Sequence, residues 1–266
     1  MTADRPPKTE NVAAVMKVFA VLETLAENRR ASLAEIAQTA MTSKTTAHRL
    51  LQTMVDLGYV EQEPETERYG LTLKLFGLGA RTLRGQEALL TVADRGMGRL
   101  SRAFGESVNL GVMDSRDQRV AYIHTYDSAF ALSMQAPLGM RNPLHCTSLG
   151  KALLAWRDEV EIGERLAAMS FEPRGPRTIT DRETFRLDLA RTRDRGFAEE
   201  IEEAEAGVRC MAAPILDHRG RSVAAISLAF PLFRFDEAKK PDYVALLCEV
   251  AREASEGLGH ATGMAP

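Results

Sequence analysis

Apolar residues at the start of the chain recur in steps of three and four positions. Over residues 12–26 this spacing marks one face of an amphipathic helix, formed by Val12, Val15, Met16, Phe19, Leu22 and Leu25. A second helix is predicted after Ser32, because Ser32 and Glu35 have the spacing of a capping box, whose cap contributes about 1 kcal/mol. The first 40 residues are therefore predicted to form two helices.

A third helix and a hairpin follow. The helix is predicted to begin at Ser43, a residue type favoured at N-caps, and to end at Gly58, which tolerates the left-handed conformation that closes helices. Residues 59–73 form two strand-like pieces around a proline-led turn, which predicts a β-hairpin. Three helices followed by a hairpin is the order of a winged helix-turn-helix.

From residue 107 onward, short strand-like runs alternate with helical ones. Predicted strands cover residues 107–114, 119–127, 131–135, 197–202, 208–217 and 222–230, and predicted helices cover residues 147–156, 161–169, 180–195 and 237–258. This mixture predicts an α+β fold with an antiparallel sheet flanked by helices. We expect a winged helix-turn-helix domain over residues 11–73, a linker helix over residues 74–94 and a second domain over residues 95–262.

Composition narrows the class of protein. The chain has 266 residues, 45% of them hydrophobic, which suits one or two globular domains. No apolar run approaches the ~20 residues needed to span a bilayer, and the polar start MTADRPPKTE lacks the apolar core of a signal peptide. We therefore expect a soluble, cytoplasmic protein with no membrane partner.

The three cysteines are widely spaced and odd in number, which argues against a disulfide framework or a structural zinc site. We expect no metal and no cofactor.

Charge restricts any DNA contact to a small surface. The formal net charge of −3 argues against binding of polyanions by the whole chain. The third helix, however, begins with partial positive charge and free N–H groups that favour a phosphate. Its polar side carries cations and hydroxyls that can contact phosphates or base edges, namely Ser43, Lys44, Thr45, Thr46, His48 and Arg49.

The hairpin is acidic, with Arg68 as its one cation among four glutamates, so we expect the helix and Arg68 to make the contacts. Two alternatives remain open from the residues alone. Helix-turn-helix hairpins also serve as protein contact modules, and a polar helix face is commonly just solvated.

Longer motifs resemble a known family. The stretch SLAEIAQTAMTSKTTAHRLLQTMVDLGYVEQEPETERYGLTLKLFGLG, followed by CTSLGKALLAW, RGFAEEIEEAEAGVRCMAAPILD and VAAISLAFP, is similar to the IclR family of bacterial transcription factors. The likeness covers about residues 11–259 and places both domains in the family's order. It implies a DNA-binding regulator whose second domain is GAF-like and binds a small organic acid.

The resemblance also implies a site. Carried over by motif, the effector-binding residues are Thr147, Ser148, Leu149, Gly150, Glu200, Cys210 and Ser227. Within the family, stretches such as RNPLHCTSLGKALLAWRDEVE are similar to the 2-keto-3-deoxygluconate repressors of sugar-acid catabolism. The implied effector is 2-keto-3-deoxygluconate or a similar acid, which releases a repressor from a palindromic double-stranded DNA operator. The implied assembly is a homodimer or a dimer of dimers.

Other functions remain as alternatives. Relatives include activators and regulators that respond to pyruvate, glyoxylate or aromatic acids. GAF-like domains also include a few redox enzymes, and His145-Cys146 is a potential nucleophilic pair. Neighbours in sequence seldom face each other, however, and an enzyme has no need of a winged helix. We expect a regulator and not an enzyme.

Overall fold

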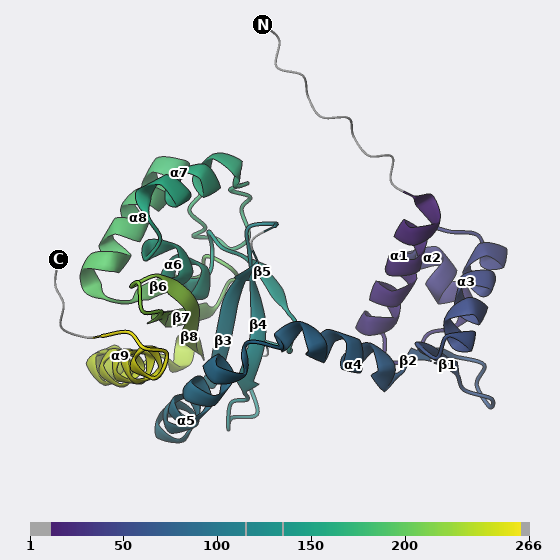
Figure 1. Ribbon diagram of the computed structural model, residues 1–266, viewed down its shortest axis with the longest axis horizontal. Helices are drawn as coiled ribbons and strands as arrows, with labels where there is room; N and C mark the ends of the chain where they lie inside the picture. The colour runs from purple at the N-terminus through teal and green to yellow at the C-terminus, as the bar shows by residue number, and fades with distance from the viewer. Residues whose placement is uncertain (1–11, 115, 135, 262–266) are drawn as a thin grey trace, which may run out of the picture. The chain divides into compact units, whose positions relative to one another are not determined.

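The computed structural model describes residues 12–114, 116–134 and 136–261 and divides into two compact units, residues 1–85 and 86–266. Figure 1 shows the helices and strands of both units. Residues 11 and 262, the expected limits of the two domains, lie outside the described residues, as does Gln135 of the expected strand 131–135.

The N-terminal unit is a winged helix-turn-helix. Its elements are α1 (Ala13–Glu27), α2 (Leu33–Thr39), α3 (Lys44–Asp56), β1 (Val60–Gln62), β2 (Tyr69–Leu71), α4 (Leu73–Ala80) and a 3₁₀ turn η1 (Arg81–Leu83). Strands β1 and β2 pair antiparallel, and Ala31 adds a bridge to Tyr69. The core between the helices and the hairpin contains Val21, Leu25, Ile36, Leu51, Met54, Val60 and Tyr69. The predicted helix order and hairpin are confirmed.

The predicted caps are present. The Ser32 hydroxyl accepts a hydrogen bond from the Glu35 N–H at 3.3 Å, and the Glu35 carboxylate accepts one from the Ser32 N–H at 2.7 Å. Ser43 caps α3 by accepting from the Thr46 N–H at 3.2 Å. Gly58 has the left-handed conformation, with φ 75°.

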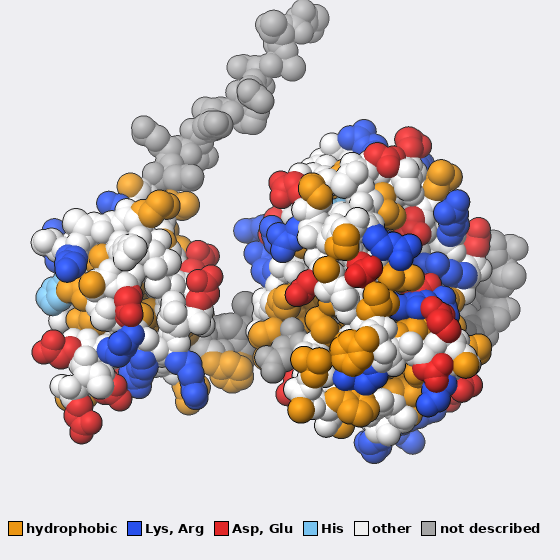
Figure 2. Space-filling model, turned by 180° about the vertical axis from the view of Figure 1, so that it is seen from behind, with side chains coloured by type: hydrophobic (Ala, Val, Ile, Leu, Met, Phe, Trp, Pro, Cys, Tyr) orange, Lys and Arg blue, Asp and Glu red, His pale blue; other side chains and the backbone are white. Residues whose placement is uncertain are grey.

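The apolar face of α1 divides in two. Leu25 packs into the core with Val21, but the residues nearer the start of the helix point to solvent. Val12, Val15, Met16 and Phe19 are 65, 50, 58 and 58% exposed. Figure 2 shows hydrophobic side chains gathered at the start of α1. Helix α4 buries no residue and exposes Leu73, Phe76 and Leu78.

The C-terminal unit is built on a six-stranded antiparallel sheet in the order β5-β4-β3-β8-β7-β6. The strands are β3 (Ser107–Asp114), β4 (Arg119–Tyr126), β5 (Arg141–Pro143), β6 (Ala198–Ile201), β7 (Val208–Leu216) and β8 (Ser222–Pro231). Helices α5 (Glu87–Phe104) and α9 (Lys240–Gly257) pack on one face. Helices α6 (Ser148–Ala155), α7 (Glu159–Ala168) and α8 (Arg182–Arg195) cover the other (Figure 1). Short 3₁₀ turns, η2 (Leu232–Arg234) and η3 (Glu237–Lys239), lead into α9. The predicted α+β fold with an antiparallel sheet is confirmed.

Two expectations from the sequence differ from the structure. The strand expected over 131–135 is wrong, because residues 131–134 are irregular and the edge strand is β5, which begins at Arg141. The Ser107 hydroxyl donates to the Met134 carbonyl at 2.7 Å, so this loop is held by a side chain and not by a strand ladder. The helix expected over 74–94 is divided between α4 and α5, and Gly85, with φ 91°, lies in the break.

Candidate functional site

The start of α3 presents a polar surface. Lys44, Thr45, His48 and Arg49 are exposed, whereas Ala47 and Leu51 on the opposite side are fully buried in the core. The side chains of Lys44, His48 and Arg49 have no hydrogen-bond or ion-pair partner among the described residues. These donors are therefore available to an external acceptor.

Two of the hydroxyls expected to contact DNA are used to start the helix. Ser43 accepts from the Thr46 N–H, and its hydroxyl donates to the Thr46 Oγ1 at 2.9 Å. The Ser43 hydroxyl therefore has its donor and one acceptor position filled, whereas Thr46 keeps its own hydroxyl donor. Among the hydroxyl groups of this surface, Thr45 is the freest.

Arg68, the expected contact in the wing, is engaged inside the unit. Its guanidinium binds the carboxylate of Glu35 at 2.8 Å, the same carboxylate that closes the capping box of α2. Arg30 is held in the same way by Glu61 at 2.7 Å. These ion pairs tie the hairpin to α2 and to the loop before it, and they neutralise the charge of both arginines.

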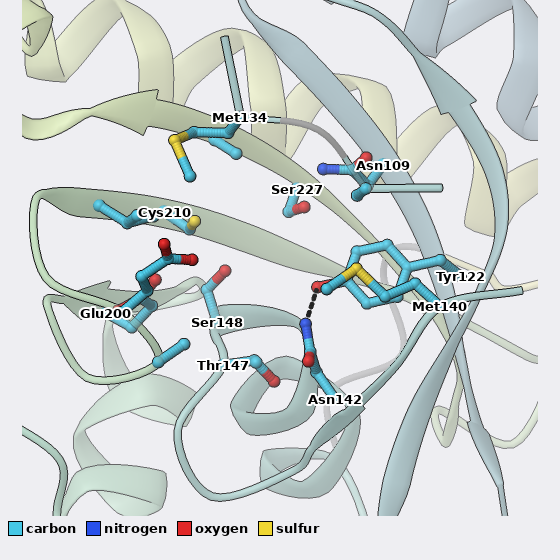
Figure 3. Close-up of a pocket in the computed structure, with 15 residues that line it drawn as sticks. Asn109, Tyr122, Met134, Met140, Asn142, Thr147, Ser148, Glu200, Cys210 and Ser227 are labelled. Atoms are coloured by element: carbon cyan, nitrogen blue, oxygen red, sulfur yellow. Dashed lines mark hydrogen bonds between the residues drawn. The ribbon is translucent and has the colours of Figure 1, made fainter. Parts of the chain in front are cut away.

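A cavity in the C-terminal unit lies between the sheet and the start of α6 (Figure 3). Five of the residues expected in an effector site line it, and they come from the start of α6 and from strands β6, β7 and β8: Thr147, Ser148, Glu200, Cys210 and Ser227. Strand register explains the convergence, because Glu200 pairs with Cys210 and Ser227 pairs with Asn109 across neighbouring strands. Side chains on paired residues of adjacent strands point to the same face.

Leu149 and Gly150, also expected in the site, do not line this cavity. The side chain of Leu149 is buried in the core beneath α6. Gly150 packs on the main chain of Leu144, where an added Cβ would lie 2.2 Å from the carbonyl oxygen. The small residue at position 150 therefore serves close packing of α6.

The start of α6 offers donors to the cavity. Thr147 is the N-cap, and its hydroxyl donates to the Pro143 carbonyl and accepts from the Gly150 N–H, both at 3.1 Å. The N–H groups of Ser148 and Leu149 are the first two of the helix and have no acceptor within it. The positive end of the helix dipole lies at the same place.

Glu200 lies beside Ser148, on the same side of the cavity as the start of α6 (Figure 3). It is 2% exposed, and its carboxylate accepts a hydrogen bond from the Glu203 N–H at 3.0 Å. Burial raises the pKa of Glu200 to about 7, opposed by that hydrogen bond and by one with the thiol of Cys210. Burial and the neighbouring Glu200 in turn raise the pKa of the Cys210 thiol.

No lysine or arginine lines this cavity among the described residues. Lys151, which follows Ser148 by three positions in α6, is buried, with 1% of its surface exposed. Its ammonium group is held by Glu203 at 2.6 Å and Asp188 at 2.7 Å. It also donates to the Glu199 carbonyl at 3.3 Å. A ligand anion in this cavity is therefore met by neutral donors and a helix N-terminus.

Several lining residues were not predicted. Tyr122 and Asn142 lie across the cavity from Glu200, and the Asn142 amide donates to the Tyr122 hydroxyl at 3.4 Å (Figure 3). Asn109 lines the cavity and is 3% exposed. A buried amide inside the otherwise apolar run SVNLGVMD is the signal that could have identified Asn109. Met134 and Met140 add apolar surface.

The residues considered for catalysis do not form a catalytic pair. His145 bonds the Glu172 carbonyl through Nε2 at 3.0 Å, whereas the Cys146 thiol lies 3.9 Å from the Pro143 carbonyl. Burial raises the pKa of Cys146 to about 12, so its thiolate is not accessible at neutral pH. The described part of the chain contains no group of three or more His, Cys, Asp or Glu side chains suited to a metal ion. None of its helices has the length and hydropathy of a membrane span.

Comparison with known proteins matches both units. Residues 14–64 match the IclR helix-turn-helix domain, and residues 82–256 match the C-terminal domain of the bacterial transcriptional regulator IclR. The chain is 43% identical to the HTH-type transcriptional regulator KdgR of Escherichia coli over 258 residues, 97% of each chain.

Solved structures agree. The IclR structure from Thermotoga maritima is 30% identical, with a TM-score of 0.78 over 92% of this chain and 98% of that one. An IclR homologue from Microbacterium hydrocarbonoxydans complexed with 4-hydroxybenzoate is 28% identical, with a TM-score of 0.76 over 93% and 99%. These relatives are regulators of transcription and not enzymes. The chain therefore belongs to the IclR family of bacterial transcriptional regulators.

Proposed function

We propose that this protein is a repressor of sugar-acid catabolism genes, released from its operator by a small keto or sugar acid such as 2-keto-3-deoxygluconate. Two features support the proposal: 43% identity over 97% of the chain to KdgR, and the cavity beside α6. The winged helix-turn-helix (residues 11–73) binds DNA, the domain over 95–262 binds the effector, and the segment 74–94 transmits the signal.

One observation in the cavity carries the choice of ligand class. Hydrogen-bonding groups stand on both sides of it: the start of α6 and Ser148 with Glu200 on one side, and Asn109, Tyr122 and Asn142 on the other (Figure 3). A two-carbon acid occupies the start of α6 and leaves the opposite wall to water. A six-carbon acid with several hydroxyls pairs with both walls, and a site built to bond a hydroxyl disfavours a ligand that lacks it.

The test is calorimetry on the full chain with 2-keto-3-deoxygluconate, pyruvate and glyoxylate, together with gel shifts on the operator. We expect 2-keto-3-deoxygluconate to bind most tightly and to release DNA, and we expect Asn142→Ala to reduce its advantage over pyruvate. Equal or tighter binding of pyruvate would exclude the sugar-acid ligand.

An aromatic acid is the second candidate. The homologue complexed with 4-hydroxybenzoate supports it, as does the apolar surface that Met134 and Met140 give this cavity. Including 4-hydroxybenzoate in the same titrations decides between the two, because an aromatic ring gains from the apolar surface of Met134 and Met140, whereas the several hydroxyls of a sugar acid gain from Asn109 and Asn142.

A homo-oligomer is expected from the way in which recognition helices bind a palindromic operator. Two recognition helices on a palindromic operator require two copies of the chain, which gives a dimer or a dimer of dimers. The exposed apolar faces of α1 and α4 are suited to contact with a second copy. Sedimentation of Met16→Glu/Phe19→Glu tests this, and an unchanged oligomer would move the contact elsewhere. We place the activity in the cytoplasm, where bacterial DNA is found.

A further inference from the structure

A second cavity of the C-terminal unit shares a wall with the proposed effector cavity. Three stretches form it: the turn between β3 and β4, the segment before α6 and the segment after α7. Asn142, Thr147 and Ser148 line the proposed effector cavity, whereas Pro143 and His145 line this one. One short stretch of chain therefore separates two distinct cavities.

Three guanidinium groups line the second cavity. Arg119 donates to the Arg141 carbonyl at 3.3 Å. Arg116 and Arg174 are exposed, and their side chains have no partner among the described residues. Two uncommitted guanidiniums from different stretches of chain therefore border the same hollow.

Two carboxylates also line the cavity, and they do not cancel this charge. Asp117 is held by Arg141 at 2.7 Å and lies 3.7 Å from Arg119. Glu172 accepts a hydrogen bond from the Ser170 hydroxyl at 3.2 Å and has no cationic partner among the described residues. Two free guanidiniums against one free carboxylate leave the hollow positive.

A buried imidazole in the wall has an unused nitrogen. His145 is 1% exposed, and its Nε2 lies 3.0 Å from the Glu172 carbonyl, which can only accept, so Nε2 carries a proton. Its Nδ1 is buried and has no partner among the described residues. Burial lowers the pKa of His145, so the ring is neutral at pH 7 and Nδ1 is an acceptor. A buried acceptor without a donor is unfavourable until a donor arrives.

We propose that this cavity binds a small oxyanion that carries its own hydroxyl, such as hydrogen phosphate or a hydroxylated phosphate ester. The guanidiniums of Arg116 and Arg174 hold its oxygens, since planar guanidinium matches phosphate geometry. Its O–H donates to Nδ1 of His145. Neither contact involves the residues of the proposed effector cavity, so this site does not depend on the proposed function.

Titration calorimetry on the full chain with inorganic phosphate, glucose 6-phosphate and sulfate tests the proposal. At neutral pH sulfate has no proton to donate, so phosphate is expected to bind at least about tenfold more tightly, a difference of ~1.4 kcal/mol. Tighter binding of glucose 6-phosphate than of phosphate assigns the site to an ester, and the reverse assigns it to the free ion. Equal affinities for phosphate and sulfate would overturn the proposal.

Variants locate the binding. Arg116→Ala/Arg174→Ala is expected to weaken phosphate binding at least about tenfold. The control Arg191→Ala/Arg219→Ala removes the same charge from exposed arginines elsewhere on the unit and is expected to leave it unchanged. Equal losses in the two pairs would mean a general charge effect and would overturn the site. Loss of phosphate binding in Ser148→Trp would instead place the ion in the cavity beside α6, which also overturns it.

Discussion

The buried carboxyl of Glu200 makes effector binding depend on pH. In the free protein its pKa is about 7, against an ordinary value of 4.5, because it is 2% exposed. An organic acid bound in the same cavity brings a second negative charge, and no lysine or arginine lines the described walls to offset it. The second charge favours the protonated form of Glu200, so binding takes up a proton.

The magnitude follows from that pKa. About nine-tenths of Glu200 is protonated at about pH 6 and about one-tenth at about pH 8. If the complex requires the protonated form, the effector dissociation constant rises about tenfold over this range, or ~1.4 kcal/mol.

The same raised pKa affects folding stability in the same direction. Between about pH 4.5 and 7 the folded state binds more protons than the unfolded state. The free energy of unfolding therefore falls as pH rises through this window.

Calorimetry in buffers of different ionisation enthalpy, HEPES and Tris, measures the proton directly. Wild type is expected to take up close to one proton per effector at about pH 8. At about pH 6 the uptake should be close to zero, because Glu200 is already mostly protonated before the effector binds. Glu200→Gln keeps a carbonyl that accepts from the Glu203 N–H and should bind with no pH dependence. Glu205→Gln is the matched control, because Glu205 lines the same cavity but is exposed, and it should behave as wild type. An affinity that is constant from pH 6 to 8 in wild type would refute the reasoning.

Three further predictions concern the DNA surface and packing. Arg49→Ala should weaken operator binding by ~1–3 kcal/mol in gel shifts while Arg191→Ala does not, and equal effects would move the DNA contact away from α3. The slope of log affinity against log salt should correspond to few phosphates per subunit, at ~0.9 each, and a slope equivalent to about ten contacts would contradict the limited cationic surface. Gly150→Ala should lower the free energy of urea unfolding by ~1–3 kcal/mol because its Cβ meets the Leu144 main chain, whereas Gly163→Ala, with open space around it, should not; a stable Gly150→Ala would contradict the packing described.

Features that depend on neighbouring residues could be predicted from the sequence. The caps at Ser32 and Ser43 each need a partner only three residues away, and both are present. The strand expected over 131–135 failed because alternation over a few residues says nothing of whether a partner strand is available. In the structure the edge position beside β4 is taken by β5.

The lining of the proposed effector cavity was predictable only in part, because it also depends on which strands are neighbours. Motifs carried over from the family led to Glu200 and Ser227, but Tyr122 and Asn142 enter through the register of β4 with β3 and of β5 with β4. The solvent-facing part of α1 has the pattern of a core helix, and the sequence cannot say whether such a face meets its own chain or another copy.

Pairing of charges explains how a chain with net charge −3 can still read DNA. Within the N-terminal unit, Arg30 pairs with Glu61 of the hairpin, and Arg68 of the hairpin pairs with Glu35 of α2, so both cations are neutralised by carboxylates of the same unit. The cations without a partner at the start of α3 are Lys44 and Arg49. Lys44 and Arg49 therefore place free positive charge on the helix that faces the operator in the proposed function. Replacing Glu35 with Gln tests this balance: it frees Arg68 to bind phosphate, and it should steepen the salt dependence of operator affinity by about one contact. An unchanged slope would show that Arg68 stays away from DNA even when it has lost its partner.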